Sequence, residues 1–219
     1  MSTPATFAFF DFDDTLAKGD SILPYLIYCI KRGLAPKRQL VKAAFAFLSW
    51  KLKPSTGRAA KETTLSFIKG RTVEEMDRIA HDFFLEVQSK AIFSSCLKEI
   101  NDLRNRNVRI VVVSASSDVY MRALPHFLRV QDVICTECEV VDGRYTGKVG
   151  KNCKGEEKVR RIQQWLEAQG LAIDKERSSG YGDSPSDAPM LLLTGTPVLV
   201  NPKKKLRARI PDGRVVHWE

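Results

Sequence analysis

With 219 residues, 43% of them apolar, the chain is long enough to bury one domain core, or a core with a small inserted domain. Its formal charge of +9 suits anionic partners, which include phosphorylated metabolites, acidic membrane surfaces and nucleic acid. No apolar run reaches the roughly 18–20 residues that cross a bilayer, and the first residues lack the pattern of a secretion signal, so we expect a cytoplasmic protein.

The first predicted element is a buried strand over residues 7–10, because four consecutive apolar residues are typical of a strand covered on both faces. Asp11, Asp13 and Asp14 follow it. Residues two apart in an extended chain point the same way, so Asp11 and Asp13 face one side with Cα atoms about 6–7 Å apart, a gap that fits a phosphoryl group. Crowded acids repel one another unless a cation relieves them, and Mg²⁺ is the leading candidate. The alternative is an acidic turn after a strand.

A small helical domain is expected next, because roughly ninety residues separate this strand from the next convincing one at residues 108–113, whereas a parallel crossover needs only about a dozen. Apolar residues recur at helical spacing in several segments of this insertion. These segments are residues 22–30, 41–52, one through Leu65 and Ile68 that stops at Gly70-Arg71, 76–87 and 92–103. Thr72–Glu75 is a capping-box signal for the start of the fourth of them, and the fifth returns the chain to the main sheet.

The stretch from Lys37 to Lys53 is both aromatic and basic, with Phe45, Phe47 and Trp50 among its lysines and its arginine. Such a helix is typical of elements that lie on a membrane surface. A helix packed on one side, with its basic side chains in water, has the same pattern. We keep both interpretations open, and the first of them predicts peripheral contact with an anionic membrane.

A second buried strand is predicted at residues 110–113, a run of β-branched residues. Ser114 follows its carboxyl end and begins a cluster with Ser116 and Ser117. Small hydroxyl groups at this place can donate a hydrogen bond to a phosphate oxygen. The alternative for Ser116 or Ser117 is to cap the helix that follows.

The rest of the chain alternates strands with helices and loops. In chain order we expect a strand at residues 130–135, a hairpin at 139–147 with its turn at Asp142-Gly143, a helix that begins around Lys158, a stretch at 179–187 in which Asp183 stands at the carboxyl end of another strand, a strand at 197–201 and a basic tail at 202–209. In the stretch at 179–187, glycines let the backbone approach a ligand, and Asp183 is expected as a metal ligand with Asp187 in support. The alternative for this stretch is a plain Gly/Ser/Asp loop.

This order of elements predicts the fold. Strands alternate with helices, and the candidate residues sit just past the carboxyl ends of strands, where open parallel sheets bind ligands. We therefore predict an α/β fold, a three-layer Rossmann-like parallel sheet with an inserted all-helical cap. The catalytic core is expected over residues 1–16 and 105–219, and the cap over residues 17–104.

The five cysteines are an odd number without a secretion signal, which indicates free thiols in a reducing compartment. Cys135 and Cys138 have the spacing of metal or redox pairs. A structural zinc site needs four ligands, however, and no second pair completes this one. We interpret both cysteines as buried or incidental.

Residues Asp11 to Leu16 resemble the first motif of the haloacid dehalogenase superfamily, whose phosphatases form an aspartyl-phosphate intermediate. The stretches around Ser114, Lys158 and residues 179–187 are similar to the other motifs of that superfamily, in the right order. Their spacing most resembles subfamily IB, which contains phosphoserine phosphatase and relatives with a small helical cap of the C1 type. The resemblance covers nearly the whole chain.

The resemblance implies a role for each matching residue. Asp11 is the expected nucleophile and Asp13 the general acid and base, while Lys158 and Ser114 balance charge on the phosphoryl group. Mg²⁺ is expected to be held by Asp11, the Asp13 carbonyl and Asp183, with Asp187 as support.

Substrate contacts are expected from Asp20, Thr15, Ala115 and Arg58. Asp20 stands where the family has an acid that contacts the amino group of phosphoserine, and Ala115 stands where it usually has glycine.

The expected function is Mg²⁺-dependent hydrolysis of a small phosphomonoester, such as phosphoserine or another amino-alcohol phosphate like histidinol phosphate. The first alternative is a membrane-surface phosphatase of lipids of the phosphatidylglycerophosphate type. The second is a non-catalytic protein that binds phosphate or nucleic acid. The intact acids and Lys158 argue against that one, and no aromatic-basic recognition motif supports nucleic acid as a partner.

Overall fold

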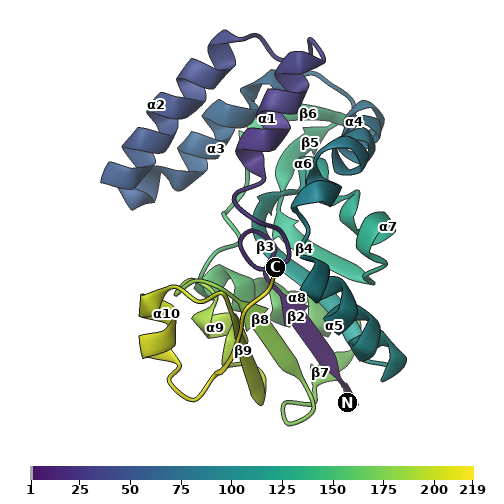
Figure 1. Cartoon of the computed structure of the whole chain (residues 1–219). Helices are drawn as coiled ribbons and strands as arrows, with labels where there is room; N and C mark the ends of the chain where they lie inside the picture. Colours follow the sequence, from purple (N-terminus) through teal and green to yellow (C-terminus); the bar gives the residue numbers. More distant parts are fainter. Residues whose placement is uncertain (1) are drawn as a thin grey trace.

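A six-stranded, fully parallel sheet forms the middle layer of the molecule (Figure 1) in the computed structural model, which describes residues 2–219. Its strands lie in the order β10 (Arg214–Val216), β9 (Thr196–Val200), β8 (Ser179–Gly182), β2 (Phe7–Phe10), β3 (Arg109–Ser117) and β4 (Asp132–Thr136). The carboxyl ends of β8, β2 and β3 therefore meet at one edge of the sheet. The predicted strands at residues 7–10, 110–113, 130–135 and 197–201 are confirmed, with small shifts of their ends.

The core forms on both faces of this sheet, because alternate residues of a strand point to opposite sides. Phe7 and Phe9 belong to one buried cluster, whereas Ala8 and Phe10 belong to the other. The first cluster is covered by α8 (Glu156–Ala168), α9 (Ala188–Leu191) and α10 (Lys204–Arg209), and the second by α5 (Ser94–Asn105), α6 (Asp118–Met121) and α7 (Leu124–Leu128). The prediction of a three-layer α/β fold is confirmed.

Four helices stand together above the carboxyl edge of the sheet, at the top of Figure 1. They are α1 (Ile22–Lys31), α2 (Arg38–Leu52), α3 (Gly57–Leu65) and α4 (Val73–Glu86), joined in part by 3₁₀ turns at Pro54–Thr56 and Ser66–Ile68. A third 3₁₀ turn, Gln88–Ala91, follows α4. Helix α4 begins at the predicted capping box, where the Thr72 hydroxyl accepts a hydrogen bond from the backbone N–H of Glu75. An inserted helical cap is thus present.

The antiparallel hairpin of β5 (Cys138–Val141) and β6 (Arg144–Val149) also joins the cap. Backbone hydrogen bonds run from Gly70 N to Tyr145 O at 2.8 Å and from Tyr145 N to Arg71 O at 3.0 Å. The predicted turn is confirmed, since Asp142 and Gly143 both have positive φ, 50° and 71°, as a tight hairpin turn requires. The cap layer therefore contains two strands in addition to its helices.

Three further features complete the fold. A short parallel pair, β1 (Thr3–Ala5) with β7 (Leu171–Ile173), extends the core and was not predicted. Helix α5 packs against β3, so it lies in the core layer, and the boundary drawn at residue 104 stays a prediction. Within residues 2–219, no helix has the length and apolar character to cross a membrane.

Candidate active site

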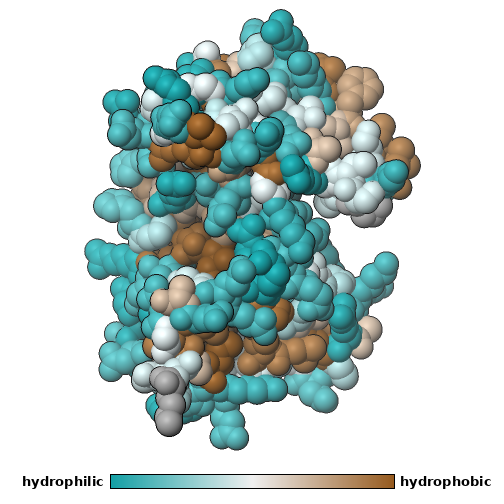
Figure 2. Space-filling model, turned by 180° about the vertical axis from the view of Figure 1, so that it is seen from behind, coloured by the Kyte–Doolittle hydropathy of each residue, from teal (hydrophilic) through white to brown (hydrophobic). Residues whose placement is uncertain are grey.

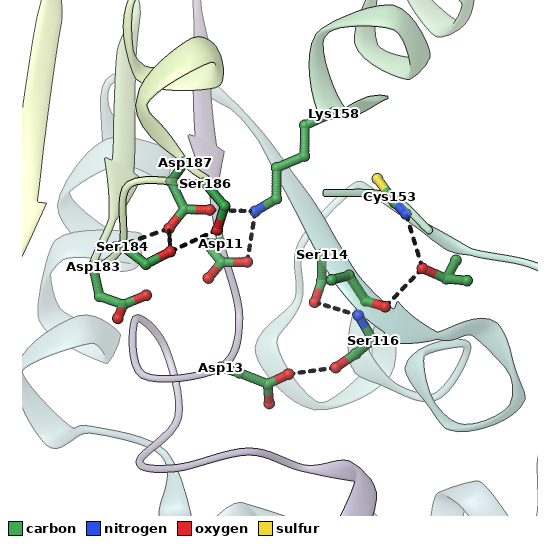
Figure 3. Close-up of polar contacts among 12 residues, drawn as sticks. Asp11, Asp13, Ser114, Ser116, Cys153, Lys158, Asp183, Ser184, Ser186 and Asp187 are labelled. Atoms are coloured by element: carbon green, nitrogen blue, oxygen red, sulfur yellow. Dashed lines mark hydrogen bonds and ion pairs between the residues drawn. The ribbon is translucent and has the colours of Figure 1, made fainter. Parts of the chain in front are cut away.

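The predicted acids and lysine come together past the carboxyl ends of β2 and β8, next to Ser114 in the carboxyl-terminal half of β3 (Figure 3). Lys158, in the first turn of α8, lies between two of the acids. Its Nζ donates to Asp11 Oδ1 at 2.7 Å and to Asp187 Oδ1 at 2.8 Å, and its side chain is only 1% exposed. Burial acts to lower the pKa of Lys158, but the two carboxylates outweigh it and raise the pKa above its ordinary value. Lys158 is therefore a buried, permanently charged ammonium group.

The two carboxylates that share Lys158 differ in their electrostatics. Burial, followed by repulsion from Asp187, raises the pKa of Asp11 well above its ordinary value, against the attraction of Lys158. Burial also acts to raise the pKa of Asp187, but there the ion pair with Lys158 outweighs it. Asp187 accepts two further hydrogen bonds, from Ser184 N at 3.0 Å and Ser184 Oγ at 2.7 Å, and its pKa is lowered. Folding thus favours the charged form of Asp187, whereas it disfavours the charged form of Asp11.

Gly182, the last residue of β8, makes the position of Asp187 possible. A Cβ atom at Gly182 would lie 2.6 Å from the Cβ of Asp187, closer than two carbon atoms approach without bonding. The sequence predicted that a glycine lets the backbone approach a ligand closely. In the structure, the group that approaches Gly182 is the side chain of Asp187 in the same loop.

Asp183 follows β8 and is buried, and burial raises its pKa against the opposing effect of Lys203. Lys203 Nζ donates to Asp183 Oδ2 at 2.6 Å and to Asp14 Oδ2 at 3.3 Å. From the sequence, Lys203 was expected as part of the basic tail at residues 202–209 and was not placed in the site. The turn that leads into α10 instead brings its ammonium group to the acid cluster.

Three buried carboxylates, those of Asp11, Asp183 and Asp187, each offer an oxygen within 4.8 Å of the others. Hard oxygen donors of this kind are the ligands that Mg²⁺ prefers, and their mutual repulsion calls for more positive charge than Lys158 supplies alone. The donor set therefore fits a magnesium ion. The Asp13 carboxylate is not part of this cluster and is bonded to Ser116 and Ser21 instead, so the metal contact through the Asp13 backbone carbonyl stays a prediction.

The carboxylate of Asp13 is held by hydrogen bonds from the Ser116 hydroxyl and from Ser21 N, the latter at 2.9 Å. Burial, then the nearby charge of Asp20, raises the pKa of Asp13 to about 6, while both hydrogen bonds oppose the rise. A carboxyl group with such a pKa can give and take a proton near neutral pH. Ser114 is buried beside it, and its Oγ accepts a hydrogen bond from Ser116 N at 3.0 Å.

A cavity of about 190 Å³ opens beside Asp13 and Ser116, between the core and the cap. Asp20 and Ala115, both predicted as substrate contacts, line it. Its cap wall is largely apolar and includes Ile22, Leu23, Ala43, Phe47, Trp50 and Ala60 beside the polar Lys61 and Thr64. The cavity is thus charged at the end that adjoins Asp13 and apolar along the cap.

Two predicted substrate contacts lie outside this cavity. Arg58 is exposed on α3, its Nε donates to Glu62 at 3.2 Å, and it faces the β5–β6 hairpin rather than the cavity. The predicted contact of Arg58 with substrate is therefore not supported by its position on α3. Thr15 is fully buried, and its hydroxyl has no hydrogen-bond partner among the described residues.

Lys61 lines the cavity and was missed by the sequence analysis. Its Nζ donates to the carbonyl of Ala115 and to the side chain of Asn152, which ties α3 to the core. Burial lowers its pKa to about 8, against the attraction of Asp20 and Asp13. The sequence held one signal that could have pointed to Lys61, because this lysine stands among mostly small residues of a cap helix. Lys154 also reaches the cavity, with its Nζ 5.2 Å from the centre of the Trp50 ring.

The five cysteines, Cys135 and Cys138 among them, are all free and buried, as predicted.

Comparison with known proteins gives relatives over nearly the whole chain. Phosphoserine phosphatase SerB1 of Mycobacterium tuberculosis is 28% identical over 213 residues, which cover 92% of this chain and 66% of that protein. Histidinol-phosphatase of Neisseria meningitidis serogroup C is 28% identical over 216 residues, which cover 91% of this chain and 91% of that protein. The chain thus spans just under two thirds of the length of the first relative and most of the second.

Solved structures show the same architecture. A protein of unknown function from Bordetella pertussis Tohama I superposes with a TM-score of 0.87 at 25% identity and covers 98% of this chain and 99% of its own. A phosphoserine phosphatase solved as a phospho-aspartyl intermediate analogue has a TM-score of 0.61 at 18% identity, covering 97% and 93%, and shares the fold. A family model described as haloacid dehalogenase-like hydrolase matches residues 8–192. Because that match includes β2, β3, Lys158 and the acids after β8, the chain belongs to the haloacid dehalogenase-like hydrolase family.

Proposed function

We propose that this protein is a Mg²⁺-dependent phosphatase that hydrolyses small phosphomonoesters through a covalent intermediate on Asp11. The observation that carries the proposal is the buried Lys158 ammonium group, fixed between Asp11 and Asp187 at the carboxyl end of β2. Nucleophilic attack on a phosphate needs a carboxylate, a fixed positive charge beside it and a group that exchanges a proton. Asp11, Lys158 and Asp13 supply these three groups.

The reaction has two steps, in which Asp11 and Asp13 alternate. First, an Asp11 oxygen forms a bond to phosphorus while the ester P–O bond breaks, and protonated Asp13 gives its proton to the departing oxygen. Second, ionised Asp13 takes a proton from water, whose oxygen bonds to phosphorus as the Asp11–phosphorus bond breaks. Free phosphate leaves, and Asp13 is again protonated. The pKa of Asp13, about 6, suits both directions of transfer.

Lys158 and Ser114 stabilise charge on the transferring group. Lys158 keeps its proton throughout, and it points into a buried site where a fixed cation is worth several kcal/mol, roughly, against developing negative charge. Ser114 offers a hydroxyl whose oxygen is already held by Ser116 N, which leaves its hydrogen free to donate. Mg²⁺, when bound by Asp11, the Asp13 carbonyl and Asp183, would add positive charge at the same oxygens.

The cavity supports an amino-alcohol phosphate as substrate. Asp20 is an exposed acid that lines the same cavity as Asp13, and it can pair with an ammonium or imidazolium group of a substrate. The relatives named phosphoserine phosphatase and histidinol-phosphatase act on substrates of this class, which supports the choice.

A phospholipid-like phosphate ester is the second candidate, and the apolar cap wall favours it. Phe47 and Trp50 line the cavity together with Leu23, so an acyl or glyceryl portion would find apolar contact there.

The test is a screen of phosphorylated metabolites and lipids with Mg²⁺ and with a chelator, in which we expect turnover that chelation abolishes. Lys158→Ala should lower kcat/KM more than ~10²-fold. Lys151→Ala is the matched control, because Lys151 is 71% exposed and pairs with Glu157 at 2.7 Å, and it should change kcat/KM less than about fivefold. Phosphate binding without turnover across the screen would identify a non-catalytic binder instead, and the reverse ranking of the two lysines would refute the role of Lys158.

A further inference from the structure

Helix α2 carries apolar side chains on two opposite sides. Its inner side packs into the cap: Ala43 is buried, and Gln39 is anchored by a hydrogen bond from Nε2 to Ser66 Oγ at 2.9 Å. A helix whose inner side is satisfied in this way normally presents polar residues to water. Helix α2 departs from that rule.

Its outer side carries four large apolar residues at positions i, i+4, i+7 and i+11, which we call the α2 stripe: Val41, Phe45, Leu48 and Leu52. Residues at this spacing share one face of a helix. Phe45 is 68% exposed and Leu52 80% exposed, so the stripe faces solvent. In Figure 2, seen from behind, hydrophobic residues gather at the upper right, the edge that α2 occupies in that view.

The charge around the stripe has one sign. Residues 21–61 contain nine basic residues and no acidic one, so the rest of the chain, with 26 basic and 26 acidic residues, is neutral. The whole net charge of the protein therefore resides in the segment centred on α2. Five of these cations flank the stripe and are exposed: Lys37, Arg38, Lys42, Lys51 and Lys53.

An apolar stripe with basic flanks is complementary to one kind of surface in particular. Nucleic acid would pair with the cations but would leave four apolar side chains in water or against phosphates. A bilayer with anionic headgroups satisfies both, because the stripe enters the boundary of the acyl chains while lysine and arginine reach the headgroups. Helix α2 has 15 residues, which suits a helix lying in the plane of the membrane and not one crossing it.

We propose that α2 docks the protein on anionic lipid membranes, with the α2 stripe inserted and its basic flanks on the headgroups. The same helix supplies Phe47 and Trp50 to the cavity wall. Docking through α2 therefore places the cavity beside the lipid surface, where an amphiphilic phosphate ester is available. The docking itself does not depend on the proposed hydrolysis.

The experiment is co-sedimentation of the full chain with vesicles of phosphatidylcholine, alone or with about one third phosphatidylglycerol, at low salt and at about 0.5 M salt. We expect binding to the anionic vesicles at low salt and at least a tenfold weaker partition at high salt or on neutral vesicles. Phe45→Ser/Leu52→Ser should weaken partition at least tenfold while thermal melting stays unchanged, because both side chains already face water.

Two matched controls separate the α2 surface from general charge and hydrophobicity. Lys42→Glu/Lys53→Glu should abolish binding, whereas Lys204→Glu/Lys205→Glu, the same charge change on exposed residues of α10, should leave it within about threefold. Leu192→Ser removes an exposed leucine elsewhere and should have no effect.

Absence of binding to anionic vesicles at low salt, or equal losses in the α2 variants and their controls, would overturn the proposal. A concentration-dependent dimer that Phe45→Ser/Leu52→Ser dissociates, without vesicle binding, would identify a second copy of the chain as the occupant of the stripe. Because sedimentation needs no turnover, it also succeeds or fails independently of the phosphatase assay.

Discussion

Asp11 and Asp187 contact the same lysine, yet we predict that neutralising them changes the stability of the metal-free protein in opposite directions. The two carboxylates each gain attraction from Lys158 at 2.7 or 2.8 Å, about 6 kcal/mol at an effective dielectric constant of about 20. Each also has the other two carboxylates of the cluster within 4.8 Å, and at that limit one repulsion costs about 3 kcal/mol at the same dielectric constant. Attraction and repulsion are thus of similar size for both acids, so the remaining contacts decide the sign.

For Asp11 the balance is unfavourable. Within the described chain its carboxylate accepts a hydrogen bond from Lys158 alone, so the cost of burying the charge is left uncompensated. A carboxyl group whose pKa is raised on folding lowers stability as the pH rises above its ordinary value of about 4. Asp11→Asn removes that cost near neutral pH and should raise Tm by roughly 2–4 °C, the equivalent of about 1 kcal/mol in a chain of this length.

For Asp187 the attraction of Lys158, together with the two hydrogen bonds from Ser184, outweighs the burial cost, and the pKa is lowered. A lowered carboxyl pKa contributes stability that is present above the ordinary pKa and is lost as the pH falls below it. In Asp187→Asn, an NH2 group replaces one of the two carboxylate oxygens. That group faces either the N–H of Ser184 or the ammonium group of Lys158, and in both cases two donors meet. We expect a loss of about 2 kcal/mol or more, a fall in Tm of roughly 4–8 °C.

The assay is thermal melting of the wild type and both variants in chelator, at about pH 5 and about pH 8. The advantage of Asp11→Asn should grow with pH, and added Mg²⁺ should stabilise the wild type more than this variant. Equal shifts of the same sign in both variants would refute the electrostatic assignment of the two acids.

Two further predictions concern neighbours of these acids. Gly182→Ala forces a Cβ into contact with Asp187 and should cost about 1–3 kcal/mol of stability and lower kcat/KM with it; melting and kinetics unchanged from the wild type would contradict the close approach. Ser116→Ala removes a hydrogen bond that lowers the pKa of Asp13, so the pH above which kcat/KM declines should rise by roughly half a unit, whereas Asp20→Asn should lower it. If the two pH profiles move together, another group than Asp13 governs the decline.

The parts of the site that lie at strand ends could be predicted from the sequence. Asp11 and Ser114 each follow an apolar run that predicts a buried strand, and parallel strands bring their carboxyl ends to one edge whatever the loops do. For these two residues local pattern and fold class are sufficient. Asp183 follows no apolar run and Lys158 is a lone lysine, so both were singled out by the resemblance of their motifs to those of the haloacid dehalogenase superfamily.

The cap residues could not be placed in this way, because their direction depends on how the cap docks. Arg58 and Lys61 lie three residues apart on α3, and only the packing of that helix decides which of them faces the cavity. Lys203 depends likewise on the turn before α10. Periodicity gives the apolar side of a helix, but the rotation of its polar side chains toward a distant partner is set by tertiary structure.

The hydrogen bonds of Lys61 bear on how firmly α3 is held against the core. The ammonium group joins cap to core, yet burial lowers its pKa, which means that the charged form would be more stable in water. The cost of burying that charge offsets part of what the contacts to Ala115 and Asn152 contribute. Lys61 therefore fixes the direction in which α3 docks more than it strengthens the docking.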